Sequence, residues 1–367
     1  MESSDAARRI RSLQAQLESD SNTVCIMFPG RNLQYLTGFY EEPTERHFLF
    51  FVPADRAPIA LVPELSAADF NSAAPWVDDI RTWTDEEGPQ TALSAALDVL
   101  APDRILLDDT MWARFTQDIR THYPEATYGL ASEALTALRI CKDATEIDAL
   151  EHAGQTADTA MNAIRSLGSD AIGMTEVELA RRIETELVEA GGTGTAFETI
   201  VGSGPNGARP HHTSGDRAIR PGEPVVLDFG TRVDGYPSDQ TRTIAFDGEP
   251  TDRVCAVHEV VKEAQAAAID AIEPGVTAES IDRAAREVIE AAGYGDRFIH
   301  RTGHGVGLDV HEAPDIVAGN ERKLEPGMVF SVEPGIYLPD EFGIRIEDLV
   351  VVTDDGAMRL NRTDRGL

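Results

Sequence analysis

An internal repeat in the second half of the chain is the feature that most constrains its fold. Gly173 and Gly191 lie eighteen residues apart, and so do Gly275 and Gly293, with a threonine two residues after the first glycine of each pair. In both segments the threonine is suited to cap the start of a helix, and the second glycine to end it. Because a repeated unit buries its apolar face against its copy, the pattern predicts one domain built from two halves.

A strand ending in an acid follows in each copy of the repeat. Pro221 leads through an apolar run to Asp228, and Pro326 leads through another to Glu333, with the same spacing of seven residues. A charge that interrupts or ends an apolar run is costly unless something compensates it. We therefore expect two helix–strand halves related by a pseudo-twofold axis, with Asp228 and Glu333 facing each other.

Each of these acids has a second carboxylate downstream. Asp239 follows a turn expected at Asp234, and Glu347 falls within a strand expected over residues 342–351. A hairpin returns the chain antiparallel, so both carboxylates can lie beside the first pair. The sequence thus predicts four carboxylates in one cleft, although any single acid in so acidic a chain could be a solvated surface group.

Four facing carboxylates require compensation. They cannot all stay ionised in a dry cleft, so either their pKa values rise or cations enter. Two divalent ions, held about 3.5–4 Å apart by bridging carboxylates, would offset the four charges. His304, between Gly303 and Gly305, could supply a neutral imidazole or be only a turn histidine. Such an oxygen-dominated set suits manganese or cobalt and tolerates zinc.

The first part of the chain reads as a separate α/β domain. Residues 1–133 alternate short apolar runs with helical patterns, and a helical region over 143–189, broken near Gly168, follows. We place the boundary between Ser132 and Lys142, which divides the chain into residues 1–133 and 134–367. The strands expected in the first domain are 23–28, 47–52, 58–62, 79–83 and 104–107, and the helices are 90–100 and 111–121.

Charge and cysteine content exclude several classes of function. The formal net charge is -32, and only three of the 32 basic residues are lysines, so a nucleic acid is not expected as a partner. A surface so rich in acids suits a salty cytosol, and we hypothesise a halophilic source. The three cysteines form no disulfide framework. The charged, helix-patterned residues 1–20 do not resemble a signal peptide, and no apolar run could span a membrane, so we expect a cytoplasmic protein.

The candidate residues lie in motifs that resemble those of a known family. The sequence is similar to the pita-bread (creatinase/aminopeptidase-fold) metallopeptidases, most of all to Xaa-Pro dipeptidases (prolidases) and aminopeptidase P. The matching motifs, covering about residues 139–353, are Asp228, Asp239 in SDQTRT, His304 in GHGVGL, Glu333 in EPGIY and Glu347 in RIED. Residues 32–39 resemble the amino-terminal domain of this class, which methionine aminopeptidases usually lack.

The resemblance implies a fold and a mechanism. The fold would be an α/β amino-terminal domain followed by an α+β pita-bread catalytic domain with an internal pseudo-twofold repeat. Asp228 would chelate one metal ion, Asp239 and Glu347 would bridge both ions, and His304 and Glu333 would complete the second. A metal-bridging hydroxide would attack the scissile carbonyl, and Glu333 would move the proton to the leaving nitrogen.

The resemblance also assigns residues around the metals. His211 and His311 would stabilise the tetrahedral intermediate and bind substrate. Arg345 and Thr241 would hydrogen-bond the ligands, and Tyr236 would contact substrate. The implied substrate is a small peptide with proline after the scissile bond, and the implied assembly is a homodimer.

Two questions of specificity stay open at this point. Asp315 stands where several prolidases have an arginine, and an aspartate would repel a free carboxyl terminus. Arg209, Arg217 or an arginine of the first domain could take that role instead. The alternatives to a prolyl peptidase are a hydrolase of this fold acting on another small amide, such as a compatible solute, and a non-catalytic binding module.

Overall fold

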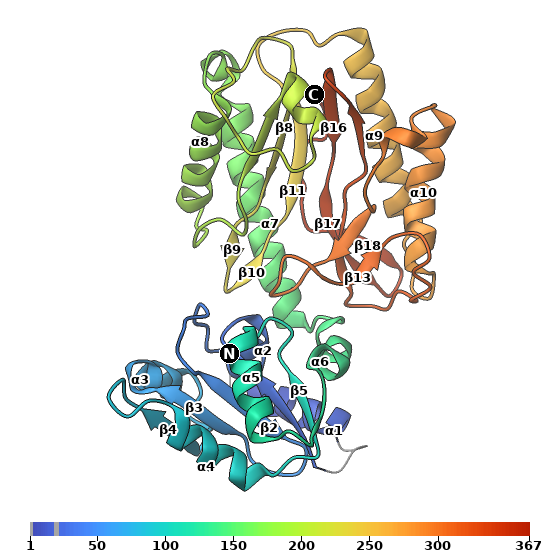
Figure 1. The fold of residues 1–367 in the computed structure, drawn as a ribbon. Coiled ribbons are helices and arrows are strands. Elements are labelled where there is room, and N and C mark those ends of the chain that lie inside the picture. Colours follow the sequence, from blue (N-terminus) through green and yellow to red (C-terminus); the bar gives the residue numbers. More distant parts are fainter. Residues whose placement is uncertain (1–2, 18–21) are drawn as a thin grey trace. The chain divides into compact units, whose positions relative to one another are not determined.

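The protein is described by a computed structural model over residues 3–17 and 22–367 (Figure 1). It divides into two compact units, Met1–Arg139 and Ile140–Leu367. Helix α6 (Ser132–Arg139) packs on α1 (Ser3–Leu17), which places residues 134–139 in the first unit. The remainder of the helical pattern expected over 1–20 lies outside the described residues.

The first unit is a mixed sheet covered by helices. Its strands run in the order β4-β3-β2-β1-β5-β6, and β1, β2 and β3 are buried along their whole length, which explains their continuous apolar runs. The strands are β1 (Thr23–Met27), β2 (Leu49–Pro53), β3 (Ile59–Pro63), β4 (Asp79–Trp83), β5 (Arg104–Leu107) and β6 (Thr127–Leu130). The remaining helices are α2 (Arg31–Thr37), α3 (Glu64–Ala73), α4 (Gln90–Leu100) and α5 (Ala113–His122). The expected strands and helices agree with these bounds to within two residues.

The second unit contains the two halves that the repeat predicts. The first half packs α7 (Ala144–Arg165) and α8 (Glu176–Glu189) on the sheet β11-β8-β7, around one apolar core. The second packs α9 (Asp252–Asp270) and α10 (Ala278–Ala291) on the sheet β13-β12-β14-β17-β18, around another. Figure 1 shows α8 and α10 on opposite sides of the strands. The expected fold class is confirmed.

The strands of the second unit are short and mostly antiparallel. They are β7 (Ile200–Ser203), β8 (Pro224–Phe229), β9 (Arg232–Val233), β10 (Tyr236–Pro237), β11 (Gln240–Ala245), β12 (Gly303–Gly305), β13 (Glu312–Ile316), β14 (Val329–Val332), β15 (Gly335–Leu338), β16 (Phe342–Arg345), β17 (Asp348–Thr353) and β18 (Gly356–Arg359). Single 3-10 turns cover Gly168–Ala171, Gly204–Ala208 and Gly295–Arg297.

The two copies of the repeated helix start differently. Thr175 caps α8 in a capping box with Glu178, whose carboxylate returns to the Thr175 N–H. Thr277 precedes α10 in the same way, but within the described residues its side chain makes no capping hydrogen bond. Ser280 stands where the first copy has Glu178, so the reciprocal partner is missing.

The prediction of one continuous strand over residues 342–351 is wrong, because the chain changes its strand-pairing partner within this range. β16 pairs with β15, whereas β17 pairs with β14, and Glu347 lies in the gap between β16 and β17. There the Glu347 N–H donates to the Thr241 carbonyl at 3.0 Å in an isolated bridge. This bridge joins β11 of the first half to the second half.

A search for membrane-spanning helices covered the described ranges, 3–17 and 22–367. None of the helices found there combines the length and the apolar character that crossing a bilayer requires.

Candidate active site

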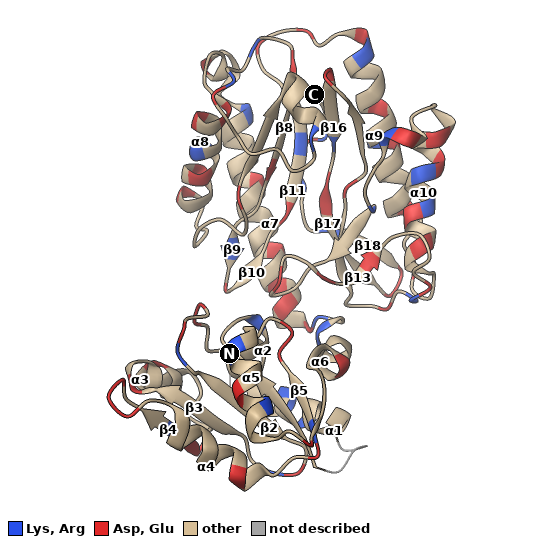
Figure 2. Ribbon diagram, in the orientation of Figure 1, with Lys and Arg blue, Asp and Glu red and all other residues tan. Residues whose placement is uncertain are grey.

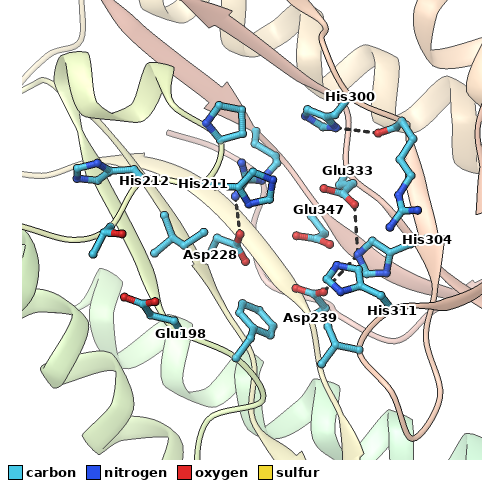
Figure 3. A pocket seen from close by; sticks show the side chains of 17 residues that line it. Glu198, His211, His212, Asp228, Asp239, His300, His304, His311, Glu333 and Glu347 are labelled. Carbon is cyan, nitrogen blue, oxygen red and sulfur yellow. Dashed lines mark hydrogen bonds and ion pairs between the residues drawn. The ribbon is translucent and has the colours of Figure 1, made fainter. Parts of the chain in front are cut away.

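A cavity of about 360 Å³ in the second unit gathers the acids that the repeat singles out (Figure 3). Its lining includes residues from both halves of the repeat. The candidate metal ligands in this lining are Asp228, Asp239, His304, Glu333 and Glu347. The expected meeting of Asp228 with Glu333 therefore takes place inside one cavity.

Strand pairing explains how the first three carboxylates meet. Asp228 on β8 pairs with Thr241 on β11, and Asp239 lies two residues before Thr241, so it points to the same face. Glu347 reaches this face through its bridge with Thr241, whose Oγ1 donates to Glu347 Oε2 at 2.6 Å. Thr241 thus lies between the carboxylates and orients one of them.

Arg345 holds the Asp228 carboxylate. Its Nη2 donates to Asp228 Oδ2 at 2.5 Å, its Nε to Thr241 Oγ1 at 3.0 Å, and its Nη1 to the Tyr337 hydroxyl at 3.0 Å. Asp228 Oδ1, in contrast, is buried and meets no hydrogen-bond partner among the described residues. A buried oxygen left open on an otherwise anchored carboxylate fits a cation ligand.

The carboxylates raise one another's pKa. Burial, followed by the charges of Asp228 and Glu333, raises the pKa of Asp239 well above its usual value. Burial, followed by the charge of Asp239, does the same to Glu347. Burial raises the pKa of Glu333 to about 7, against the opposing charge of Arg345. Without a compensating cation the cluster therefore resists full ionisation.

His304 offers a neutral nitrogen to this cluster. Burial, followed by the charge of His311, lowers the pKa of His304 to about 3. Its Nδ1 faces the Gly305 carbonyl at 3.2 Å, while its Nε2 lies 3.4 Å from Glu333 Oε1 and 3.7 Å from Asp239 Oδ2. A ring that donates through Nδ1 directs the lone pair of Nε2 at the acids.

Two glycines explain how His304 reaches this place. A Cβ on Gly303 would collide with the Ser331 carbonyl, and one on Gly305 would collide with the Ala313 carbonyl. The glycines thus let β12 lie tightly between β13 and β14, where Ser331 Oγ accepts from the His304 N–H at 3.0 Å.

The donor set fits a divalent cation. One ligand atom each from Asp239, His304 and Glu347 lies within 4.8 Å of the other two, and all three residues are buried. With Asp228 and Glu333 in the same lining, carboxylate oxygens outnumber the single imidazole. Such a set is suited to bind divalent cations.

Two further histidines lie in the cavity. His211 lines it, and His311 lies beside His304, with ring centroids 4.1 Å apart (Figure 3). Burial, followed by the charge of Arg301, lowers the pKa of His311, so its ring is neutral at physiological pH. A neutral imidazole can donate one hydrogen bond to an oxyanion that develops in the cavity.

The sequence matches two family models that together cover nearly the whole chain. The Metallopeptidase family M24 model matches residues 148–354, and the Creatinase/Prolidase N-terminal domain model matches residues 9–141. The chain belongs to metallopeptidase family M24. The expected metallopeptidase, with a creatinase-type amino-terminal domain ahead of its catalytic domain, is confirmed.

Individual relatives of this M24 enzyme are similar over their full length. An Xaa-Pro dipeptidase of Lactobacillus helveticus is 39% identical over 97% of both chains, and a probable dipeptidase PepE of Mycobacterium bovis is 42% identical over 97% of this chain and 94% of its own. Among solved structures, a prolidase from Thermococcus sibiricus has a TM-score of 0.94 at 38% identity, covering 99% of this chain and 98% of its own.

Tyr236 does not lie where the sequence predicted. Among the described residues it is absent from the cavity lining, and its hydroxyl donates to Glu146 Oε1 on α7 at 2.8 Å. The cause is the tight turn at Asp234, which places Tyr236 in the small β9–β10 hairpin and turns its ring toward the helix. In this structure of the M24 enzyme, Tyr236 therefore contacts α7 and does not line the cavity.

Other residues of the lining escaped the sequence analysis. His300 and Arg301 line the cavity, and the His300 Nε2 lies 2.9 Å from the Tyr337 hydroxyl that also accepts from Arg345. His212 also lines the cavity, and its Nε2 lies 2.7 Å from Glu176 Oε2. His300 and Arg301 could have been found from their position in the sequence, because they lie just before the motif that contains His304.

Proposed function

We propose that this M24 enzyme hydrolyses the peptide bond between an amino-terminal residue and a following proline, with two divalent ions at the carboxylate cluster. The single observation that carries the proposal is the convergence of Asp228, Asp239, His304, Glu333 and Glu347 in one cavity with His211 and His311. The relatives named Xaa-Pro dipeptidase and prolidase support the choice of substrate.

The five clustered residues, Asp228, Asp239, His304, Glu333 and Glu347, would hold the ions. When bound, such ions polarise a carbonyl and lower the pKa of water to near neutrality. Arg345 and Thr241 keep the carboxylates in place through the hydrogen bonds described above. The protein therefore holds the carboxylate oxygens and the imidazole nitrogen in fixed positions around one cavity.

Glu333 is the residue we assign to proton transfer. Its carboxylate lines the cavity, with Oε1 3.4 Å from His304 Nε2, where it could accept a proton and then donate it. The proton would pass to the nitrogen of the leaving proline. His211 and His311 would each donate a ring N–H to the oxygen of the tetrahedral intermediate.

The chemistry of proline favours a site that binds the substrate through the carbonyl of the scissile bond. A bond to proline has no N–H, and the ring fixes φ near -65°. A peptidase that binds its substrate through the N–H of the scissile bond cannot make that hydrogen bond to a prolyl peptide. A site that binds the substrate carbonyl does not need this N–H.

Metal identity, cellular location and assembly belong to the same proposal. The oxygen-rich donor set supports manganese or cobalt, with zinc accepted. All three cysteines are free in the described part of the chain, which agrees with a reducing, cytoplasmic compartment. We propose a homodimer, which sedimentation of the purified enzyme would test.

The test is turnover of matched substrates by the manganese-loaded enzyme. We expect hydrolysis of Ala-Pro and slower hydrolysis of Ala-Ala, which differs in the residue after the scissile bond. An Ala-Pro-Ala tripeptide separates dipeptidase from aminopeptidase P action. Hydrolysis of a cyclic amidine with no hydrolysis of any prolyl peptide would favour a small-amide hydrolase and overturn the proposal.

A further inference from the structure

The cavity lining contains one carboxylate that the candidate metal cluster does not use. Four of the five acids in the lining are candidate metal ligands, and the fifth is Glu198. Glu198 is exposed and lies two residues before β7. Figure 3 shows it well apart from Glu333 and His304. Glu198 therefore shares the cavity with the cluster without belonging to it.

No cation of the protein neutralises Glu198. Over residues 3–17 and 22–367, its side chain takes part in no hydrogen bond or ion pair. Both arginines of the lining are engaged elsewhere, since Arg345 donates to Asp228 and Arg301 donates to Asp315. The Glu198 carboxylate can therefore accept hydrogen bonds from a cation that enters the cavity as part of a substrate.

Apolar side chains lie on both sides of Glu198 in the sequence. Phe197 and Ile200 both line the cavity. The Phe197 ring packs against Gly230, where a Cβ would lie 2.9 Å from Phe197 Cε1. Ile200 pairs with Asp228 across β7 and β8, so this apolar wall continues to the candidate metal ligands. An apolar wall with an acid on the same segment fits a side chain that has an aliphatic stem and a positive end.

We propose that Glu198 gives the enzyme a preference for substrates whose amino-terminal residue is lysine or arginine, by pairing with the cationic end of that side chain. The inference rests on the proposed function, in which the carbonyl of this residue lies at the metal ligands. The aliphatic stem then contacts Phe197 and Ile200, and the ammonium or guanidinium group meets Glu198. Because Glu198 is exposed, water screens the pair, and the preference is several-fold and not absolute.

The test compares Lys-Pro with norleucine-Pro, because norleucine has the aliphatic stem of lysine without its ammonium group. We expect the manganese-loaded enzyme to have a kcat/KM about 3- to 10-fold higher for Lys-Pro, mainly through KM. Glu198→Gln keeps the size of the side chain but removes its charge, and should bring this ratio close to one. Glu198→Lys inverts the charge and should bring the ratio below one.

The control variant is Glu189→Gln, which removes an exposed acid at the end of α8, outside the lining. It should leave the ratio unchanged. An equal fall of the ratio in Glu189→Gln and Glu198→Gln would indicate long-range attraction by a chain with a net charge of -32, and would overturn a local contact. Misfolding or loss of metal lowers both rates together, so the ratio does not register it.

Two further results would overturn the role of Glu198 alone. One is equal use of Lys-Pro and norleucine-Pro by the unmodified enzyme. The other is a ratio that Glu198→Gln leaves unchanged, as expected if Glu198 bound the α-amino group that both substrates share. Failure to hydrolyse any prolyl peptide would instead overturn this inference together with the proposed function.

Discussion

The Asp228 carboxylate uses its two oxygens differently. Arg345 donates to Oδ2, while Oδ1 is buried without a hydrogen-bond partner in the part of the chain that the structure describes. An anchored oxygen fixes the direction of the free one, as in metal sites where partners of the ligands set ligand geometry. The arrangement suggests a substitution that removes the charge but keeps the shape.

Asp228→Asn should abolish turnover while the fold is retained. The amide keeps the size of the side chain but loses the charge that would bind a cation, so we expect a drop in bound metal and a loss of kcat of more than about 100-fold. Metal analysis after manganese loading, with circular dichroism for the fold, measures both. Asp234→Asn, in an exposed turn, is the matched control, and full activity of Asp228→Asn would refute the ligand assignment.

Buried His258 predicts sensitivity to acid. Burial lowers its pKa to about 4, and its Nε2 has no hydrogen-bond partner within residues 3–17 and 22–367. Above the ordinary pKa of about 6.5 the ring is neutral in both states; below it only the unfolded chain is protonated, so stability falls until the pH reaches the folded-state value. One pKa unit corresponds to about 1.4 kcal/mol, so His258 costs about 2 kcal/mol at about pH 5.

His258→Gln should remove this contribution. The difference in the free energy of unfolding between about pH 7.5 and about pH 5 should shrink by about 2 kcal/mol relative to the unmodified protein, as measured by urea titration. The variant and the unmodified protein share all other histidines, so their acid responses cancel in the comparison. An unchanged difference would contradict the assignment.

At the scale of elements, Glu176 connects a helix to the loop that carries His211. This first residue of α8 is fully buried, and its carboxylate accepts from the Ser203 N–H and hydroxyl, from Asn206 and from the Gly215 N–H, with the His212 ring beside it. Burial alone would raise the pKa of Glu176, but these hydrogen bonds outweigh it and lower the pKa. The loop is thus tied to the start of α8.

Glu176→Gln should loosen this loop. The amide nitrogen cannot accept the hydrogen bonds that the lost oxygen accepted, so we expect kcat to fall about 10-fold while bound metal stays constant. Steady-state kinetics and metal analysis together test this. Glu189→Gln, exposed at the other end of α8, should change neither quantity, and loss of metal in Glu176→Gln would show that the loop supports the cluster itself.

Prediction from sequence succeeded where a pattern depended on local chemistry. Asp228 and Glu333 could be placed because each breaks an apolar run at the same point of a repeat, and both line one cavity. The interruption of the strand at Glu347 could not, because it depends on a bridge to Thr241 more than a hundred residues away. Tyr236 and Arg301 show the same limit, since the direction of a side chain depends on what packs around its backbone.

At the scale of the whole molecule, the charge is distributed over both units. Figure 2 shows acidic residues on the helices of each unit, within a formal net charge of -32. One of the few lysines, Lys142, is buried and paired with Glu312 at 2.7 Å, so it does little to offset the surface. Self-repulsion of this size destabilises the compact state when salt does not screen it.

The midpoint of thermal unfolding should therefore rise between low salt and molar KCl. At molar salt the Debye length falls to about 3 Å, which screens the repulsion between surface carboxylates. Scanning calorimetry at several KCl concentrations measures the shift. Equal midpoints in low and molar KCl would contradict the halophilic hypothesis.

The division of the ligand set between the two halves has a consequence for folding. Asp228 and Asp239 come from the first half, and His304, Glu333 and Glu347 from the second. Neither half alone carries the full set, so a bound ion would cross-link residues that are far apart in the sequence. The free energy of ion binding would then add to the stability of the packing between the two halves. A chelator would then lower the free energy of unfolding of this unit as well as its catalytic activity.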